Sequence, residues 1–83
     1  MKATIMNESL MIKNRAFEKG NIVEIIAGPA DGRQFIIGRI EGFMKTREGD
    51  ILLKVDASTL YHATTKILVV EDIVSIRQVY EEV

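Results

Sequence analysis

Hydrophobic residues after Gly20 occur in short β-branched runs separated by clusters of turn-forming residues. The clusters at 28–32 and 45–50 are rich in Gly, Pro and Asp, which suit the backbone angles of tight turns. Because isoleucine and valine favour extended chain, the runs between the clusters predict β-strands. Five strands are expected, over residues 21–27, 33–44, 51–57, 65–70 and 73–79. Only two acidic residues separate the last two strands, which predicts a single 3₁₀ turn there.

The first twenty residues carry helix punctuation in the order that a short helix requires. Asn7 stands where an N-cap belongs, and Gly20 follows two late cations as a C-terminal glycine would. This order predicts a helix over residues 8–19. An extended N-terminal segment is the alternative, because residues 4–6 and 10–12 are also compatible with strands.

The second expected strand contains two glycines and an imperfect alternation of apolar side chains. Gly38 and Gly42 predict a strong bend or a close backbone contact, since neither has a side chain to pack. A bulge near residues 36–38 would bring Phe35 and Ile40 to one side of the sheet. Alternation along the five strands then predicts a buried core made of Val23, Ile25, Phe35, Ile40, Leu53, Val55, Leu68, Val70, Ile73 and Ile76.

The composition fits one small domain, residues 1–83, that associates with further copies of itself. Of the 83 residues 47% are hydrophobic, whereas a domain of this size can bury only about 60–65% of its unfolded surface. The apolar excess therefore favours a homo-oligomer. The lack of cysteine excludes disulfides and thiolate chemistry. With no signal-like start and no apolar run of membrane-span length, we expect a cytoplasmic protein without a membrane partner.

Charge is distributed unevenly along the chain, although the net charge is only −1. Residues 1–20 carry a net charge of +2 and residues 71–83 a net charge of −3. This head-to-tail asymmetry would suit the pairing of subunits, and two solvated chain ends are the simpler explanation. A net charge near zero does not support a general affinity for nucleic acid.

Candidate groups for catalysis are few. His62 is the single histidine and lies in a polar connection, so a metal site would need carboxylates from separate turns. Two acidic pairs, Glu48 with Asp50 and Glu71 with Asp72, occupy turns, where turn formation is their expected role. No glycine-rich phosphate loop is present. The sequence therefore predicts neither an enzyme nor a bound cofactor or metal.

Basic and aromatic residues gather in the second strand and the turn after it. Such a group can contact single-stranded RNA, because cations meet phosphates and aromatic rings stack on bases. Glu41, Glu48 and Asp50 lie between the cations, as on an ordinary charged surface. The candidate nucleic-acid contacts are Arg33, Arg39, Phe43, Lys45 and Arg47.

Two groups of segments resemble the motifs of Sm-like proteins. The first group comprises residues 21–25, 32–35 and 38–43, and the second comprises residues 66–70 and 73–76. The chain is also similar to the small C-terminal barrel of bacterial ribosome maturation factors, and its turn at 28–32 is similar to that of KOW motifs.

The resemblance implies a mainly β fold, a five-stranded SH3-like or Sm-like barrel over residues 21–79 preceded by the short helix. It also implies that strand four of one subunit pairs with strand five of the next. Where the family has an Arg–Gly pair for RNA, this chain has Glu71 and Asp72. The interface implied in this way contains Ile67, Leu68, Val69, Val74, Ser75 and Ile76.

The expected function is that of a non-catalytic, oligomerising interaction or regulatory module, of the kind that phages and plasmids encode. The acidic pair at the family's RNA site favours this interpretation. The alternative is an Sm-like protein that binds single-stranded RNA through the cations of the second strand and its following turn. The expected partner is a further copy of the chain, and another protein or RNA are the other candidates.

Overall fold

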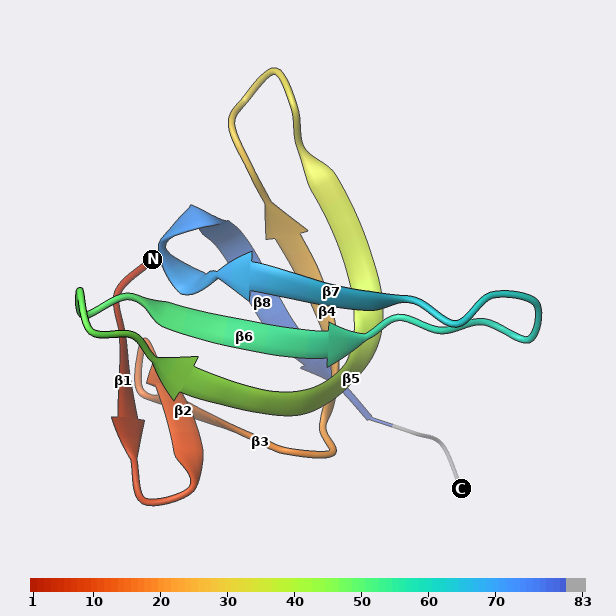
Figure 1. Ribbon diagram of the computed structural model, residues 1–83. Coiled ribbons are helices and arrows are strands. Elements are labelled where there is room, and N and C mark those ends of the chain that lie inside the picture. Colours follow the sequence, from red (N-terminus) through yellow and green to blue (C-terminus); the bar gives the residue numbers. More distant parts are fainter. Residues whose placement is uncertain (81–83) are drawn as a thin grey trace.

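The computed structural model describes residues 1–80 as antiparallel β-strands with one 3₁₀ turn (Figure 1). The strands form two sheets, with the orders β1-β2-β3 and β7-β6-β5-β4-β8. The predicted mainly β class and the 3₁₀ turn are confirmed, and the five later strands lie within one residue of their expected bounds. The elements are β1 (Ala3–Met6), β2 (Ser9–Ile12), β3 (Arg15–Glu18), β4 (Ile22–Ala27), β5 (Gln34–Lys45), β6 (Ile51–Asp56), β7 (Thr65–Val69), η1 (Val70–Asp72) and β8 (Ile73–Val79).

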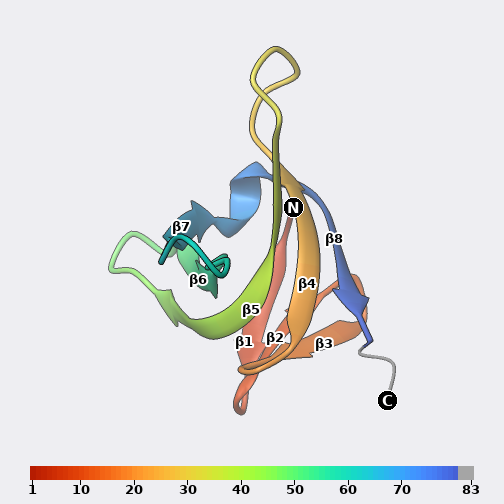
Figure 2. The same cartoon turned by 90° about the vertical axis from the view of Figure 1, so that its right-hand side faces the viewer.

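The five-stranded sheet curls strongly but does not close into the predicted barrel. β7 and β8 are the two edges of this sheet, yet only the three residues of η1 connect them. So short a connection requires the sheet to curl until its edges approach at that end (Figures 1 and 2). Among the described residues no ladder joins β7 to β8, so the sheet is open and the barrel prediction was wrong.

The first twenty residues form an antiparallel meander, β1 to β3, instead of the predicted helix. Two-residue turns, Asn7-Glu8 and Lys13-Asn14, connect its strands. The φ angles of Asn7, Lys13 and Asn14 are 56°, 49° and 64°, in the left-handed region that tight hairpin turns use and that Asn tolerates well. The helix prediction was wrong because Asn7 begins a hairpin turn and does not cap a helix.

The meander packs against the concave side of the curled sheet and shares its core. The Met1 ammonium donates a hydrogen bond of 2.9 Å to the Glu71 carbonyl, which ties the start of the chain to η1. At the other end of the meander the Gly20 N–H donates to the Ile40 carbonyl at 2.8 Å. The meander therefore shields the apolar side chains on the inner side of the sheet from water, as closure of a barrel would otherwise do. The meander residues buried in the common core are Leu10, Ile12 and Phe17.

Most of the predicted core is buried. The confirmed positions are Val23, Ile25, Ile40, Leu53, Val55, Val70 and Ile73. Leu68 and Ile76 are partly buried and pack against this core. Besides the three meander residues, Ala27 and Ile36 are buried without having been predicted.

Phe35 was wrongly assigned to the core, because its side chain is 62% exposed. The predicted bulge at 36–38 does not occur, and β5 pairs with β4 in a regular register. The irregularity in β5 lies instead between Ile40 and Gly42, on the side of β6. Unbroken alternation therefore turns Ile36 inward and Phe35 outward.

Gly38 and Gly42 offer a matched pair of substitutions in β5. A Cβ at Gly38 would lie 2.6 Å from Val55 Cγ1 and closer still to the Asp56 carbonyl oxygen, whereas the space around Gly42 is open. Gly38→Ala should lower the free energy of unfolding by about 1–3 kcal/mol, and Gly42→Ala should change it by less than about 0.5 kcal/mol. Thermal melts measure both effects. A Gly38→Ala protein as stable as the wild type would contradict the close approach of β5 and β6.

Candidate interaction surface

β7 and β8 each have one side without a partner strand in the described part of the chain. β7 pairs with β6 and β8 pairs with β4, so each presents a row of backbone donors and acceptors on its other side. Exposed apolar side chains lie on both strands, since Ile67 is 65% exposed and Val74 is 46% exposed. Neither strand contains the proline that often protects an edge. Both edges are therefore candidates for the addition of a strand from another chain.

The interface residues predicted from the sequence all lie on these two strands, but they face different sides. Leu68 pairs with the buried Leu53 and points inward, and Ile76 also packs against the core. These two side chains would stabilise the edge strands by packing on the core, without contacting another chain themselves. Ile67, Val74 and Ser75 are the exposed members of the predicted set, and Val69 is partly buried.

The predicted nucleic-acid contacts do not form a single cluster. The Arg33 guanidinium donates a hydrogen bond to the Gly28 carbonyl in the turn before β5. The Arg39 guanidinium donates to the Gly20 carbonyl at 2.7 Å, on the middle part of the strand. β5 has twelve residues, so about 36 Å of chain separates its two ends. The cations therefore occupy three separate places on the surface.

Lys45 and Arg47 are the members of this set that lie close together in sequence, at the β5–β6 turn. Both side chains are exposed, and the turn is held by a hydrogen bond of 2.7 Å from the Thr46 N–H to the Asp50 carbonyl. Phe43, the predicted aromatic contact, is partly buried and packs against the core. The RNA contact stays a prediction, and Lys45 and Arg47 in this turn are the basic residues that remain as its candidates.

Some charged side chains on the surface form ion pairs with other residues of the same molecule. Glu24 and Arg77, which are cross-strand partners of β4 and β8, form an ion pair. The hydrogen bond that Arg77 donates to Glu24, together with the charge of that carboxylate, raises the pKa of Arg77 above its ordinary value. Lys54 and Glu41 form a second pair, with 3.4 Å between Nζ and Oε2. Each pair joins opposite charges, so the two pairs add no net charge to the surface.

The β6–β7 connection, residues 57–64, is a loop with an apolar tip that sequence reasoning missed. It projects away from both sheets, in teal in Figure 1. The Ala57 N–H donates to the Thr64 carbonyl at 2.9 Å and holds its base. At its tip Leu60 is 96% exposed and Tyr61 is 87% exposed. Two adjacent apolar residues within a run of Ser and Thr were the signal available in the sequence.

Asp56 fixes the start of this loop. Its Oδ1 accepts a hydrogen bond of 2.9 Å from the Ser58 N–H. The side chain and the backbone N–H of Ser58, and to a smaller extent the charge of Arg39, lower the pKa of Asp56. Asp56 is therefore ionised at neutral pH, which keeps the loop base hydrogen-bonded.

A further apolar strip lies on the outer face of β4 and β5. Ile26 and Phe35 are cross-strand partners, and Ile37 lies two residues further along β5. Their exposed fractions are 36%, 62% and 50%. Ile26 lies on β4, which pairs with both β5 and β8, whereas Phe35 and Ile37 lie in the first half of β5, which pairs with β4 before the ladder to β6 begins at Arg39. The strip offers apolar side-chain contacts.

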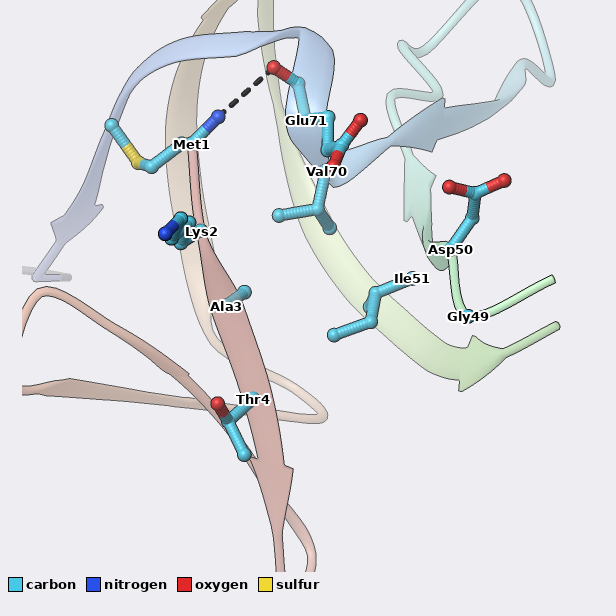
Figure 3. A pocket seen from close by; sticks show the side chains of 9 residues that line it. All are labelled: Met1, Lys2, Ala3, Thr4, Gly49, Asp50, Ile51, Val70 and Glu71. Carbon is cyan, nitrogen blue, oxygen red and sulfur yellow. Dashed lines mark hydrogen bonds between the residues drawn. The ribbon is translucent and has the colours of Figure 1, made fainter.

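A shallow hollow lies at the joint between the two sheets (Figure 3). The hydrogen bond from Met1 to Glu71 spans one end of it, where β1 meets η1 (Figure 3). Lys2, Asp50 and Glu71 give it charges of both signs at the solvent boundary. We interpret it as the seam of the fold. Its lining consists of Met1, Lys2, Ala3, Thr4, Gly49, Asp50, Ile51, Val70 and Glu71.

Within residues 1–80, no three side chains among His, Cys, Asp and Glu gather in a way that could hold a metal ion. The same stretch contains no helix long and apolar enough to cross a membrane.

Comparison of the chain with protein-family models, with curated proteins and with solved structures gave no match. The function must therefore be argued from the strand edges, the surface charges and the loops.

Proposed function

We propose that the protein is a non-catalytic interaction module that associates with further copies of itself through the edges of its five-stranded sheet. The observation that carries the proposal is the open edge of both β7 and β8, each with an exposed apolar residue on its strand. Edges of this kind are templates for pairing with another chain. The high hydrophobic content, 47% of the residues, supports an assembly that buries part of this surface.

The pairing should join β7 of one copy to β8 of the next. These two edges differ in sequence, so the contact is heterologous, and repetition of it generates a ring or an open filament. Pairing of β7 with β7, or of β8 with β8, would leave the other edge of each copy free. The resemblance to Sm-like proteins implies the same pairing and supports it from the sequence.

RNA binding is the alternative function, with Lys45 and Arg47 as its candidate contacts. Both are exposed and lie close together in the β5–β6 turn. Arg33 and Arg39 donate to backbone carbonyls of their own copy, which weakens the case for a continuous basic surface. We therefore place RNA binding second.

Light scattering over a range of protein concentrations tests the proposal. The expected mass is a multiple of the 9.3 kDa of one chain, and it should not change when a mixed pool of single-stranded RNA is added. A mass of one chain at every concentration would refute the proposal.

The same measurement distinguishes the alternative. If RNA is the ligand, a salt-sensitive complex should form with the pool, and Lys45→Ala with Arg47→Ala should weaken it. Each lost phosphate contact on a single strand reduces the slope of log affinity against log salt by about 0.7, so the double variant should reduce it by about 1–2.

A further inference from the structure

We infer that Lys13 and Arg15 of one copy form ion pairs with Glu71 and Asp72 of the next copy, and that these pairs fix the direction in which the edges join. This inference rests on the proposed function, because it describes the contact between a β8 edge and a β7 edge. Its starting point is a groove beside β8 that contains two cations.

The groove lies between the first half of β8 and the turn that connects β2 to β3. Lys13 and Arg15 are exposed, and within residues 1–80 their side chains form no hydrogen bond or ion pair. Two positive charges therefore lie beside the N-terminal half of the β8 edge. The residues that line the groove are Met1, Ile12, Lys13, Arg15, Phe17, Val74, Ser75 and Ile76.

The acidic counterpart follows directly after β7. Glu71 and Asp72 belong to η1 and are exposed, and neither carboxylate forms an ion pair with the other described residues. Their backbone carbonyls accept hydrogen bonds of 2.9 Å, that of Glu71 from Met1 (Figure 3) and that of Asp72 from Gly28. The backbone of this turn is therefore fixed, while its two carboxylates are free to meet another copy.

Antiparallel pairing brings the two sets of charges together. When β7 of the next copy runs antiparallel to β8 with its last residue beside Ser75, the chain after β7 continues along Val74 and Ile73, beside the groove. That chain is η1 of the next copy, which contains Glu71 and Asp72. Parallel pairing would place the same carboxylates beside the end of β8, about 20 Å from its first residue. Every ladder within the copy is also antiparallel.

These ion pairs should act on direction and partner choice more than on affinity. Ion pairs between exposed groups contribute little to stability, whereas like charges placed against each other oppose association strongly. Reversal of one set of charges is therefore a sharper test than its removal. Reversal of both sets, in separate molecules, should create two variants that associate with each other.

The experiment uses Lys13→Glu/Arg15→Glu and Glu71→Lys/Asp72→Lys, each alone and as an equimolar mixture. Each variant alone should associate at least about tenfold more weakly than the wild type, as measured by light scattering across concentrations. The mixture should recover the association of the wild type, because each contact then joins opposite charges. Lys19→Glu/Arg47→Glu is the matched control, since it makes the same change in net charge outside the groove and should assemble normally.

The outcomes separate this inference from the proposed function. A wild type that stays at the mass of one chain overturns both. If the wild type assembles, this inference alone is overturned in either of two cases. The first is that a reversed variant assembles as well as the wild type, and the second is that the mixture does not recover the association of the wild type. Circular dichroism verifies the folding of each variant. If a reversed variant is unfolded, the single reversals Lys13→Glu and Glu71→Lys replace the pair, and their mixture must assemble more strongly than either alone for the inference to stand.

Discussion

Phe17→Ala should lower the free energy of unfolding by about 3–5 kcal/mol, a large part of the about 5–15 kcal/mol that stabilises a typical domain. The side chain of Phe17 is 2% exposed and belongs to the core that the meander shares with the curled sheet. Its removal leaves a cavity between the two sheets, which the surrounding strands can fill only in part. Chemical denaturation followed by circular dichroism measures the loss.

Phe35→Ala is the matched control, because the same side chain is removed from a position that is 62% exposed. It should change the free energy of unfolding by less than about 1 kcal/mol. Equal losses for the two variants would mean that the meander does not pack as described. A larger loss for Phe35→Ala would mean that the register of β5 is shifted by one residue.

Ile67→Lys and Val74→Lys should each abolish self-association while leaving the fold intact. A lysine on an edge strand opposes the approach of another strand, because the contact would remove its charge from water without a partner. Both positions are exposed in the single copy, at 65% and 46%, so the melting temperature should change little. The association constant should fall at least about a hundredfold, as followed by light scattering.

Ile37→Lys is the control for this prediction. Ile37 is 50% exposed and equally apolar, but it lies on β5 and not on β7 or β8. Its variant should assemble as the wild type does. If Ile37→Lys lost assembly while the two edge variants still assembled, the interface would lie at the outer strip of Ile26, Phe35 and Ile37.

The strands after Gly20 could be predicted because their signals are local. Runs of isoleucine and valine favour extended chain, and the Gly, Pro and Asp clusters between them mark the turns within a residue or two. The same local chemistry explains why the 3₁₀ turn was predicted correctly, since only two residues separate the last two runs. Of the two glycines for which a bend or a close backbone contact was predicted, Gly38 makes the close contact, whereas the space around Gly42 is open.

Strands in the first twenty residues were the alternative to the predicted helix, and the choice was wrong because Asn and Gly serve helix ends and hairpin turns alike. Asn7 can cap a helix or adopt the positive φ of a two-residue turn, and the sequence near it suits both. Packing of Leu10, Ile12 and Phe17 on the sheet decides between them, and this contact is remote in sequence. Phe35 was misplaced for a related reason, because the position of a bulge depends on the partner strand.

The candidate surface follows from strand order, which the local pattern does not contain. β7 and β8 were predicted as strands, but their free edges depend on the order β7-β6-β5-β4-β8 and on the absence of closure in residues 1–80. The groove with Lys13 and Arg15 depends in turn on the meander. The sequence around Leu60 and Tyr61 predicts a polar connection, since Ser58, Thr59, His62 and Thr64 surround them, and the exposed apolar tip is not evident from it.

Hydrogen–deuterium exchange at low and high protein concentration tests the central claim most directly, because it reports which backbone amides become protected on association. Protection should rise with concentration in β7 and β8, whose edges pair between copies. The edge of β1 should exchange at the same rate at both concentrations. Concentration-dependent protection confined to the meander, or none in β7 and β8 while the protein is assembled, would contradict the account.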